Sequence, residues 1–183
     1  MDSSSSANTP EIVTSTPIFS GRVFSVRQEV VRFPDGREAT LDLIAHPGSF
    51  GILAFVRENE IVLVRQYRHA VGEWLWEIPA GTAEPGEAPL DGARRELAEE
   101  TCYRCERIRE LGHSFYVTPG YCNERLSLFL AEGLTPGEQS LDEDERIEVR
   151  IFPLHDVKAM VDRGEIHDAK TIVAMQLSLG GTG

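Results

Sequence analysis

The chain has 183 residues, of which 41% are hydrophobic and 26% are charged, the ordinary composition of a globular domain. This length allows one domain with a sizeable core, or one domain with a small appendage. The formal net charge of −12 argues against a nucleic-acid-binding surface, which would need a basic stripe. No apolar run approaches the roughly 18 residues of a membrane-spanning helix.

The amino terminus, MDSSSSANTPE, is small, polar and free of arginine, so we expect a disordered tail over residues 1–15 and no targeting peptide. Three cysteines, an odd number without a secretory signal, favour reduced thiols in a cytoplasmic protein. The spacing of Cys102 and Cys105 would suit zinc or redox chemistry, but a matching second pair is missing, which favours free thiols.

Residues 16–47 read as two strands around the turn Pro34-Asp35-Gly36, in which proline presets φ and glycine takes the positive φ. This pattern predicts an antiparallel hairpin. Because a lone hairpin is marginally stable in water, it should pack on the main domain, over residues 48–180, or on a second subunit.

Two apolar runs, 51–56 and 60–68, have strand length and are separated by a polar turn, which predicts buried strands. Arg65 and Arg68 end the second run, and Trp74 follows closely. A guanidinium can bind phosphate oxygens through two hydrogen bonds, and an aromatic ring can stack on a base. These three are therefore candidate substrate-binding residues; the alternative for each arginine is an ordinary surface position.

A third strand pattern, residues 74–80, leads into a helix-forming run at 88–101. On that helix Glu96, Glu99 and Glu100 project from one exposed face. Like charges at this spacing repel each other, whereas Mg²⁺ or Mn²⁺ would bind their oxygens. The alternative is a solvated acidic helix.

The remaining pattern predicts four more strand segments and then two helices, with an acidic loop at 141–146 before the last strand. The expected strands are 107–111, 114–117, 125–131 and 147–152, and the expected helices are 153–163 and 168–179. This order of strands, helix, strands and helices indicates an α+β fold.

One stretch of this chain resembles a known signature, the Nudix box of hydrolases that cleave nucleoside diphosphates linked to another moiety. The resemblance implies a Nudix-type α/β/α sandwich with a mixed sheet, preceded by the hairpin. Cys102 departs from the pattern, because the family has glycine there. Since a Cβ makes a left-handed residue cost about 1 kcal/mol, we expect this helix end to be built differently. The matching residues are Gly81, Glu87, Arg95, Glu96, Leu97, Glu99 and Glu100.

The resemblance also implies roles for individual residues around a bound Mg²⁺, with Mn²⁺ as the alternative metal. Glu96 and Glu100 would be the main ligands, together with the backbone carbonyl of Ala80. Glu99 would be a further ligand or an orienting group, and Glu87 would lie near a metal or behind its ligands.

The resemblance implies catalytic roles for three further residues. Arg95 would pair with a box carboxylate and hold it in place. In the acidic loop, Glu143 is the first choice, and Glu145 the second, for a mobile glutamate that completes the metal site or activates water.

Two features resemble the ADP-ribose pyrophosphatase branch of the family. They are the sequence EIPAG at 77–81 and a proline, Pro119, 16 residues after Tyr103. The loop from Pro119 to Glu124 supplies these two residues as further substrate-binding candidates. The implied activity is Mg²⁺-dependent hydrolysis of ADP-ribose to AMP and ribose 5-phosphate. The implied enzyme is a cytoplasmic homodimer, intertwined through its amino-terminal segments.

Two other functions stay open. The substrate could be another nucleoside diphosphate sugar, such as GDP-mannose, because no feature of the sequence identifies the base that is recognised. A Nudix domain can also sense a nucleotide without catalysis, although such domains usually lose box carboxylates and here every one is present.

Overall fold

The structure is a computed structural model that describes residues 8–137 and 147–180. The chain divides into two compact units. The first comprises Met1–Gly48 and Tyr116–Arg125, and the second comprises Ser49–Phe115 and Leu126–Gly183. No helix among the described residues is long and apolar enough to cross a membrane.

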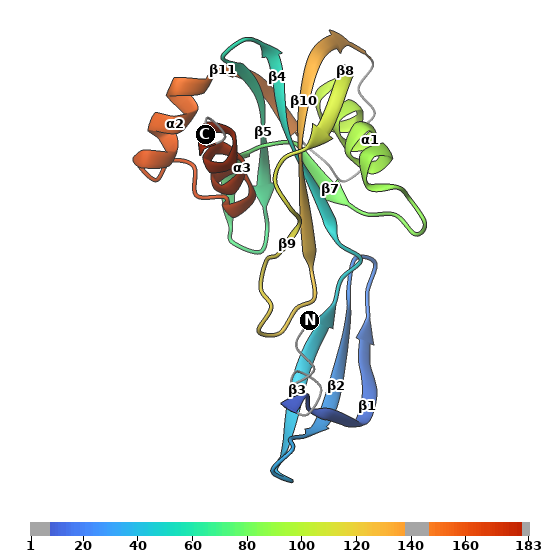
Figure 1. Cartoon of the computed structure of the whole chain (residues 1–183). Coiled ribbons are helices and arrows are strands. Elements are labelled where there is room, and N and C mark those ends of the chain that lie inside the picture. The colour runs from blue at the N-terminus through green and yellow to red at the C-terminus, as the bar shows by residue number, and fades with distance from the viewer. Residues whose placement is uncertain (1–7, 138–146, 181–183) are drawn as a thin grey trace. The chain divides into compact units, whose positions relative to one another are not determined.

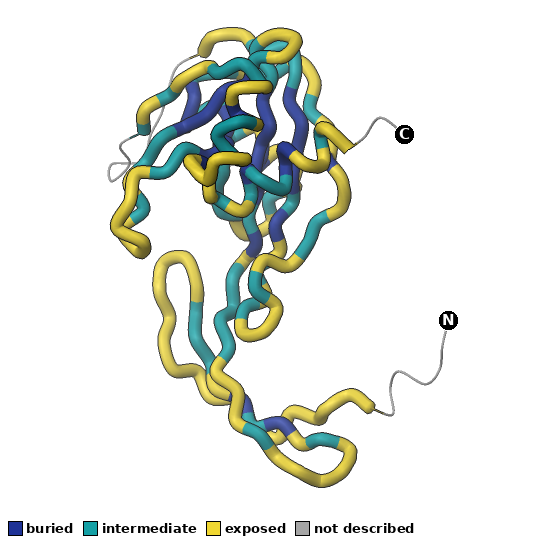
Figure 2. Tube along the Cα trace, turned by 90° about the vertical axis from the view of Figure 1, so that its left-hand side faces the viewer, coloured by how far each residue is buried: buried dark blue, intermediate teal, exposed yellow. Residues whose placement is uncertain are grey.

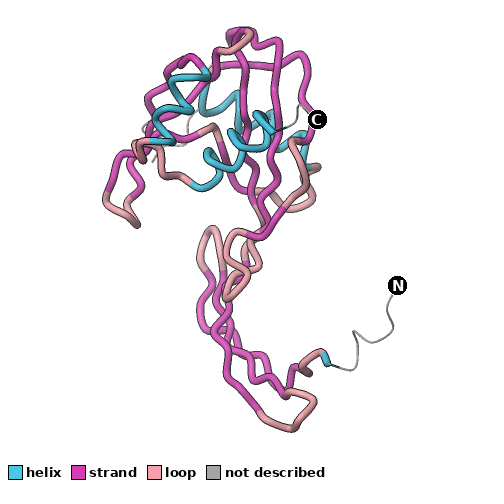
Figure 3. Tube along the Cα trace, turned by 60° about the vertical axis from the view of Figure 1, so that its left-hand side comes forward, coloured by secondary structure: helices cyan, strands magenta, loops and turns pink. Residues whose placement is uncertain are grey.

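The first unit contains a three-stranded antiparallel sheet in the order β1-β2-β3. Strands are magenta in Figure 3. Its strands are β1 Glu11–Ser20, β2 Ser25–Arg32 and β3 Glu38–Ala45. The predicted hairpin is present as β2 and β3, which pair from Ser25 and Ala45 to Arg32 and Glu38. Gly36 in the connecting turn has a φ of 85°, the conformation for which glycine is suited.

The prediction of a disordered tail up to residue 15 is wrong for its last part, since β1 begins at Glu11. Ile12, Thr14, Thr16 and Ile18 alternate along this strand, and β-branched residues favour extended backbone. The polar neighbours and Pro17 concealed that alternation. Every residue of β1 is exposed.

The sequence did not show that residues 116–125 belong to the first unit. In the structure this loop pairs with the end of β3, where Ile44 N donates to Tyr121 O at 2.7 Å and Asn123 N donates to Ile44 O at 3.2 Å. The contact joins residues far apart in sequence, which local patterns do not report.

The second unit is built on an eight-stranded mixed sheet in the order β11-β5-β4-β10-β8. Beside this path, β6 pairs with β5, β7 with β4 and β9 with β10. Strands β4 and β10 are parallel, whereas β10–β8, β4–β5 and β11–β5 are antiparallel. The strands are β4 Ser49–Arg57, β5 Glu60–Arg68, β6 Glu73–Glu77, β7 Ala80–Thr82, β8 Tyr103–Glu110, β9 Phe115–Tyr116, β10 Arg125–Pro136 and β11 Ile147–Pro153.

Helices cover both faces of this sheet, with α1 on one side and α2 and α3 on the other (Figure 1). Their bounds are α1 Pro89–Thr101, α2 Leu154–Asp162 and α3 Ala169–Gly180, close to the predicted ranges. The α/β/α sandwich is therefore confirmed. Coverage on both faces also explains why most of β4 and residues 61–64 of β5 are continuously apolar.

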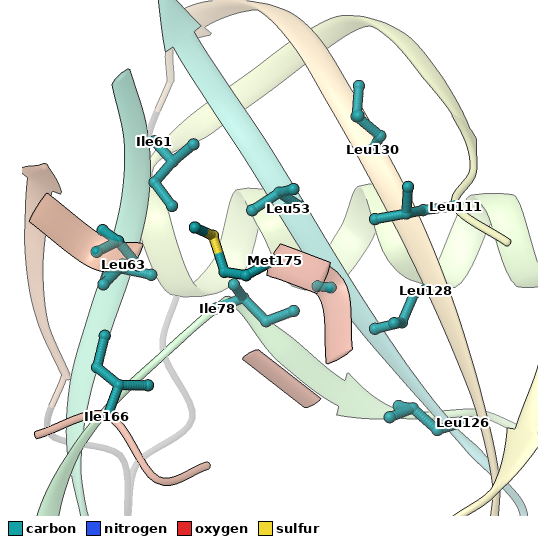
Figure 4. Packing of buried hydrophobic residues seen from close by; sticks show 12 residues of the cluster. Leu53, Ile61, Leu63, Ile78, Leu111, Leu126, Leu128, Leu130, Ile166 and Met175 are labelled. Atoms are coloured by element: carbon teal, nitrogen blue, oxygen red, sulfur yellow. The ribbon is translucent and has the colours of Figure 1, made fainter. Parts of the chain in front are cut away.

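The core has two layers, and the buried segments of this unit follow the sheet (Figure 2). Between the sheet and α1, Ala93 and Leu97 pack on Phe50, Ile52 and Phe129. On the other face, a larger cluster joins the sheet to α2 and α3 (Figure 4). Its buried members are Leu53, Ile61, Leu63, Ile78, Leu111, Leu126, Leu128, Leu130, Val157, Ile166, Ala174 and Met175.

The expectation that Cys102 changes the helix end is wrong. Helix α1 ends with Cys102 in the left-handed conformation, at φ 63° and ψ 12°, just where a glycine would fit. Cys102 N donates to Ala98 O at 3.2 Å, and Cys102 O accepts from Gly137 N at 2.5 Å. These hydrogen bonds hold the backbone in place despite the Cβ.

Candidate active site

Glu100 points from α1 into the protein and not towards solvent. It is 3% exposed, which corrects the expectation that it lies on an exposed helix face. Its Oε2 accepts a hydrogen bond from Ala80 N at 2.9 Å, and its Oε1 accepts one from Gln66 Nε2 at 3.5 Å. The carboxylate therefore joins α1 to β7 and β5. A solvated acidic helix would not bury this group.

Glu96 lies directly over Gly81. A Cβ added to Gly81 would come within 1.8 Å of the Glu96 carboxylate carbon and 1.9 Å of its Oε1. Only glycine therefore lets the carboxylate approach the backbone this closely. Glu96 and Glu100, which are one turn apart on α1, thus both lie at the Ala80–Gly81 peptide.

Arg95 binds three carboxylates of the box. Its Nε and Nη2 donate to the two oxygens of Glu87 at 2.9 and 3.1 Å. Its Nη1 donates to Glu96 Oε1 and to Glu99 Oε2, both at 2.8 Å. The hydrogen bond from Arg95 lowers the pKa of Glu87, and the same bond raises the pKa of Arg95, so both remain charged at neutral pH.

Among the described residues, no three His, Cys, Asp or Glu side chains form a ready metal-binding group. Glu96 and Glu99 instead contact Arg95. The donors around Ala80 still fit a hard dication, since carboxylate and carbonyl oxygens are its preferred ligands. The missing side chain at Gly81 leaves the Glu96 carboxylate against this peptide.

Arg68 on β5 forms a two-point ion pair with Glu77 on β6, through Nε at 2.8 Å and Nη2 at 2.6 Å. The Glu77 side chain is 1% exposed and also binds Lys170 Nζ. Burial alone would raise the pKa of Glu77, but the hydrogen bonds and charges of Arg68 and Lys170 lower it. The sequence did not indicate that Glu77 pairs with Arg68 or that Lys170 shares this carboxylate. The pairing of β5 with β6 was the available signal.

Arg65 and Trp74 form a separate contact. The Arg65 guanidinium carbon lies 5.7 Å from the Trp74 ring centre and 5.9 Å from that of Trp76. Since side chains alternate along a strand, Arg65 and Arg68 leave opposite faces of β5. The structure therefore groups Arg65 with the tryptophans and Arg68 with Glu77.

Four predicted site residues are not among the described residues of the second unit. Pro119 and Glu124 belong to the first unit, where Val117 N donates to Glu124 O at 3.2 Å across the loop. Glu143 and Glu145 lie outside the described residues.

Comparison with known proteins gives the family. The sequence model of the NUDIX domain matches residues 45–174. The chain belongs to the Nudix family. This confirms the resemblance of the Gly81–Glu100 stretch to the Nudix box.

Two curated relatives cover most of this Nudix chain. An ADP-ribose pyrophosphatase of Bacillus subtilis is 40% identical over 161 residues, which span 87% of this chain and 86% of the relative. A methanol dehydrogenase activator of Bacillus methanolicus is 39% identical over 161 residues, with the same coverage of both chains. Among solved structures, an ADP compounds hydrolase superposes with a TM-score of 0.83, at 20% identity over 94% of this chain and 93% of the other.

Proposed function

We propose that this Nudix hydrolase cleaves the diphosphate of ADP-ribose to give AMP and ribose 5-phosphate, with Mg²⁺ as its metal and Mn²⁺ as a substitute. The convergence of Glu96 and Glu100 on the Ala80–Gly81 peptide carries this proposal. The 40% identity to an ADP-ribose pyrophosphatase over most of both chains supports the choice of substrate.

The metal-holding residues are Glu96, Glu100 and the carbonyl of Ala80, with Glu99 as a further ligand or orienting group. A bound dication there would neutralise diphosphate charge and lower the pKa of the attacking water. Arg95 keeps Glu96 and Glu99 in place and ties them to Glu87 on the preceding loop. Its charge offsets the repulsion among these carboxylates.

Arg68 is the residue that binds the diphosphate, since Glu77 already fixes one edge of its guanidinium. Arg65 and Trp74 supply a second binding surface that a base or ribose could contact. Pro119 and Glu124 shape the substrate loop. Glu143 takes the proton from the attacking water, and Glu145 is the second choice for this step.

The test is turnover against ADP-ribose, GDP-mannose, NADH and diadenosine polyphosphates, with Mg²⁺ or with EDTA. We expect rapid release of AMP from ADP-ribose with Mg²⁺, and none with EDTA. Glu100→Gln should keep its fold, because the amide has the same shape, and lose turnover by at least about 100-fold. Near-normal rates in this variant would refute the metal assignment.

The same panel separates the alternatives. Preference for GDP-mannose would keep the metal site and replace the substrate, whereas no turnover of any compound by the wild type would favour a nucleotide sensor. Glu143→Gln should lower turnover with little effect on KM, and an unchanged rate would move this role to Glu145.

We also propose that the enzyme is a cytoplasmic homodimer joined through its first unit. Several large apolar side chains of the three-stranded sheet and of its β1–β2 connection are exposed, and exposed apolar surface of this kind marks an interaction surface. They are Ile12, Ile18, Phe19, Val23, Phe24 and Leu41.

A further inference from the structure

Three polar residues at the start of α3 and just before it are not used by the proposed mechanism. Asp168 and Lys170 have side chains that are only 14% and 15% exposed, and Thr171 is fully buried. Buried polar groups are costly unless they are paired, so their arrangement needs a reason. Lys170 contacts Glu77 and Thr171 contacts Ile78, in the segment that leads into the Ala80–Gly81 peptide, and Asp168 contacts both Lys170 and Thr171.

The first connection is ionic. Lys170 Nζ donates to Glu77 Oε2, the oxygen that also accepts from Arg68 Nη2 at 2.6 Å. The same ammonium donates to Asp168 Oδ1 at 3.0 Å. Two cations and two anions therefore alternate in the order Arg68, Glu77, Lys170, Asp168. Loss of Lys170 would leave this buried cluster with an excess negative charge.

The second connection consists of hydrogen bonds that reach the backbone. Asp168 Oδ2 accepts from Thr171 N at 3.0 Å and from Thr171 Oγ1 at 2.6 Å. Thr171 Oγ1 in turn accepts from Ile78 N at 2.9 Å. Further along, Pro79 O accepts from Ile52 N at 2.8 Å, so the backbone after Glu77 is fixed at successive residues.

A purely structural role does not require these charges, because apolar residues of similar volume stabilise a protein as well as a buried ion pair does. The charges do have an effect on Arg68. Because Lys170 and Arg68 share one oxygen of Glu77, Lys170 holds the carboxylate that orients the Arg68 guanidinium. The Arg68 side chain is 40% exposed, and its Nη1 is not used in the pair with Glu77.

We propose that Lys170, supported by Asp168 and Thr171, is a positioning residue for diphosphate binding. It holds Glu77, and Glu77 holds Arg68 in the orientation that receives the substrate. This inference rests on the proposed function, in which Arg68 binds the diphosphate.

The first experiment compares Lys170→Met and Lys170→Arg with the wild type in steady-state hydrolysis of ADP-ribose. Arg68 contributes binding, so Lys170→Met should raise KM about tenfold and change kcat less than about twofold. Lys170→Arg, which keeps the charge, should restore KM to within about threefold. Lys158→Met is the matched control: Lys158 pairs with Asp162 on the exposed side of α2, so this substitution should have no effect.

A second pair of variants needs no catalysis. Thr171→Val keeps the shape but removes the acceptor of Ile78 N, whereas Thr171→Ser keeps the hydroxyl. Hydrogen–deuterium exchange at the Ile78 amide should be about tenfold faster in Thr171→Val than in Thr171→Ser. KM should rise in Thr171→Val alone, which tests the inference even if Lys170→Met fails to fold.

The outcomes separate the two proposals. Unchanged KM in Lys170→Met or Thr171→Val, beside an active wild type, would overturn this inference alone. A lower kcat at unchanged KM would do the same, since the effect would then bypass Arg68. A wild type that neither hydrolyses nor binds ADP-ribose would overturn both proposals.

Discussion

Gly81 is the residue on which the position of the Glu96 carboxylate depends. A Cβ there would overlap the end of a flexible side chain, which can move away, and not the rigid backbone. Gly81→Ala should therefore keep the fold but displace Glu96 from the Ala80–Gly81 peptide. We expect turnover to fall about 100-fold, the usual scale for a catalytic group moved by about 1 Å.

The measurement is kcat with Mg²⁺, together with the thermal unfolding midpoint. Gly180→Ala provides the control, because a Cβ at Gly180 meets no atom within 4 Å. A Gly81→Ala enzyme with wild-type kcat would mean that the location of Glu96 over Gly81 does not matter for catalysis.

Cys102 occupies a left-handed position in which its Cβ costs free energy. Cys102→Gly should relieve that strain and raise the free energy of unfolding by about 1 kcal/mol, less the added entropy of the unfolded chain. Urea denaturation measures the change. Cys102→Ala keeps a Cβ, so it should give no such gain; equal stabilisation by both substitutions would point to the thiol instead.

At the scale of elements, the pairing of β5 with β6 makes stability depend on pH through Glu77. Its folded pKa is lowered, so its contribution is present above the unfolded pKa of about 4.3 and is lost as pH falls towards the folded pKa. Glu77→Gln should cost about 3 kcal/mol at pH 7, because it leaves Arg68 and Lys170 without their shared anion.

Denaturation measured from pH 7 to pH 3 tests this dependence. The difference in the free energy of unfolding between wild type and Glu77→Gln should become smaller as the pH falls below about 5. Glu58→Gln, at an exposed turn, should parallel the wild type throughout. If this difference in the free energy of unfolding stays constant with pH, Glu77 contributes through packing and not through its charge.

Elements were predictable from the sequence where a local pattern set them. The helix-forming run predicted α1, and the spacing of Glu96, Glu99 and Glu100 predicted that they share one side of it. The apolar runs predicted β4 and β5. The partners of those elements were not predictable. The contacts of Glu100 with Gln66, and of Glu77 with Lys170, join residues 34 and 93 positions apart. No local periodicity reports such pairs.

At the scale of the whole molecule, the exposed apolar side chains of the first unit support the proposed homodimer. Light scattering should give about twice the chain mass of 20.3 kDa. Ile18 is 60% exposed on β1, so Ile18→Asp should shift the mass towards that of a monomer. Leu177→Asp, at a 38% exposed residue of α3, should leave the mass unchanged. A monomeric wild type would refute the dimer.

The contacts of Arg95 also bear on how the protein responds to metal supply. In a structural zinc domain the ion is the countercharge that lets the chain fold. Here the chain carries part of its own countercharge, because Arg95 pairs with Glu87, Glu96 and Glu99. We expect EDTA to stop turnover while lowering the unfolding midpoint by less than about 3 °C. The protein can therefore stay folded when metal is scarce and regain activity when the ion binds again.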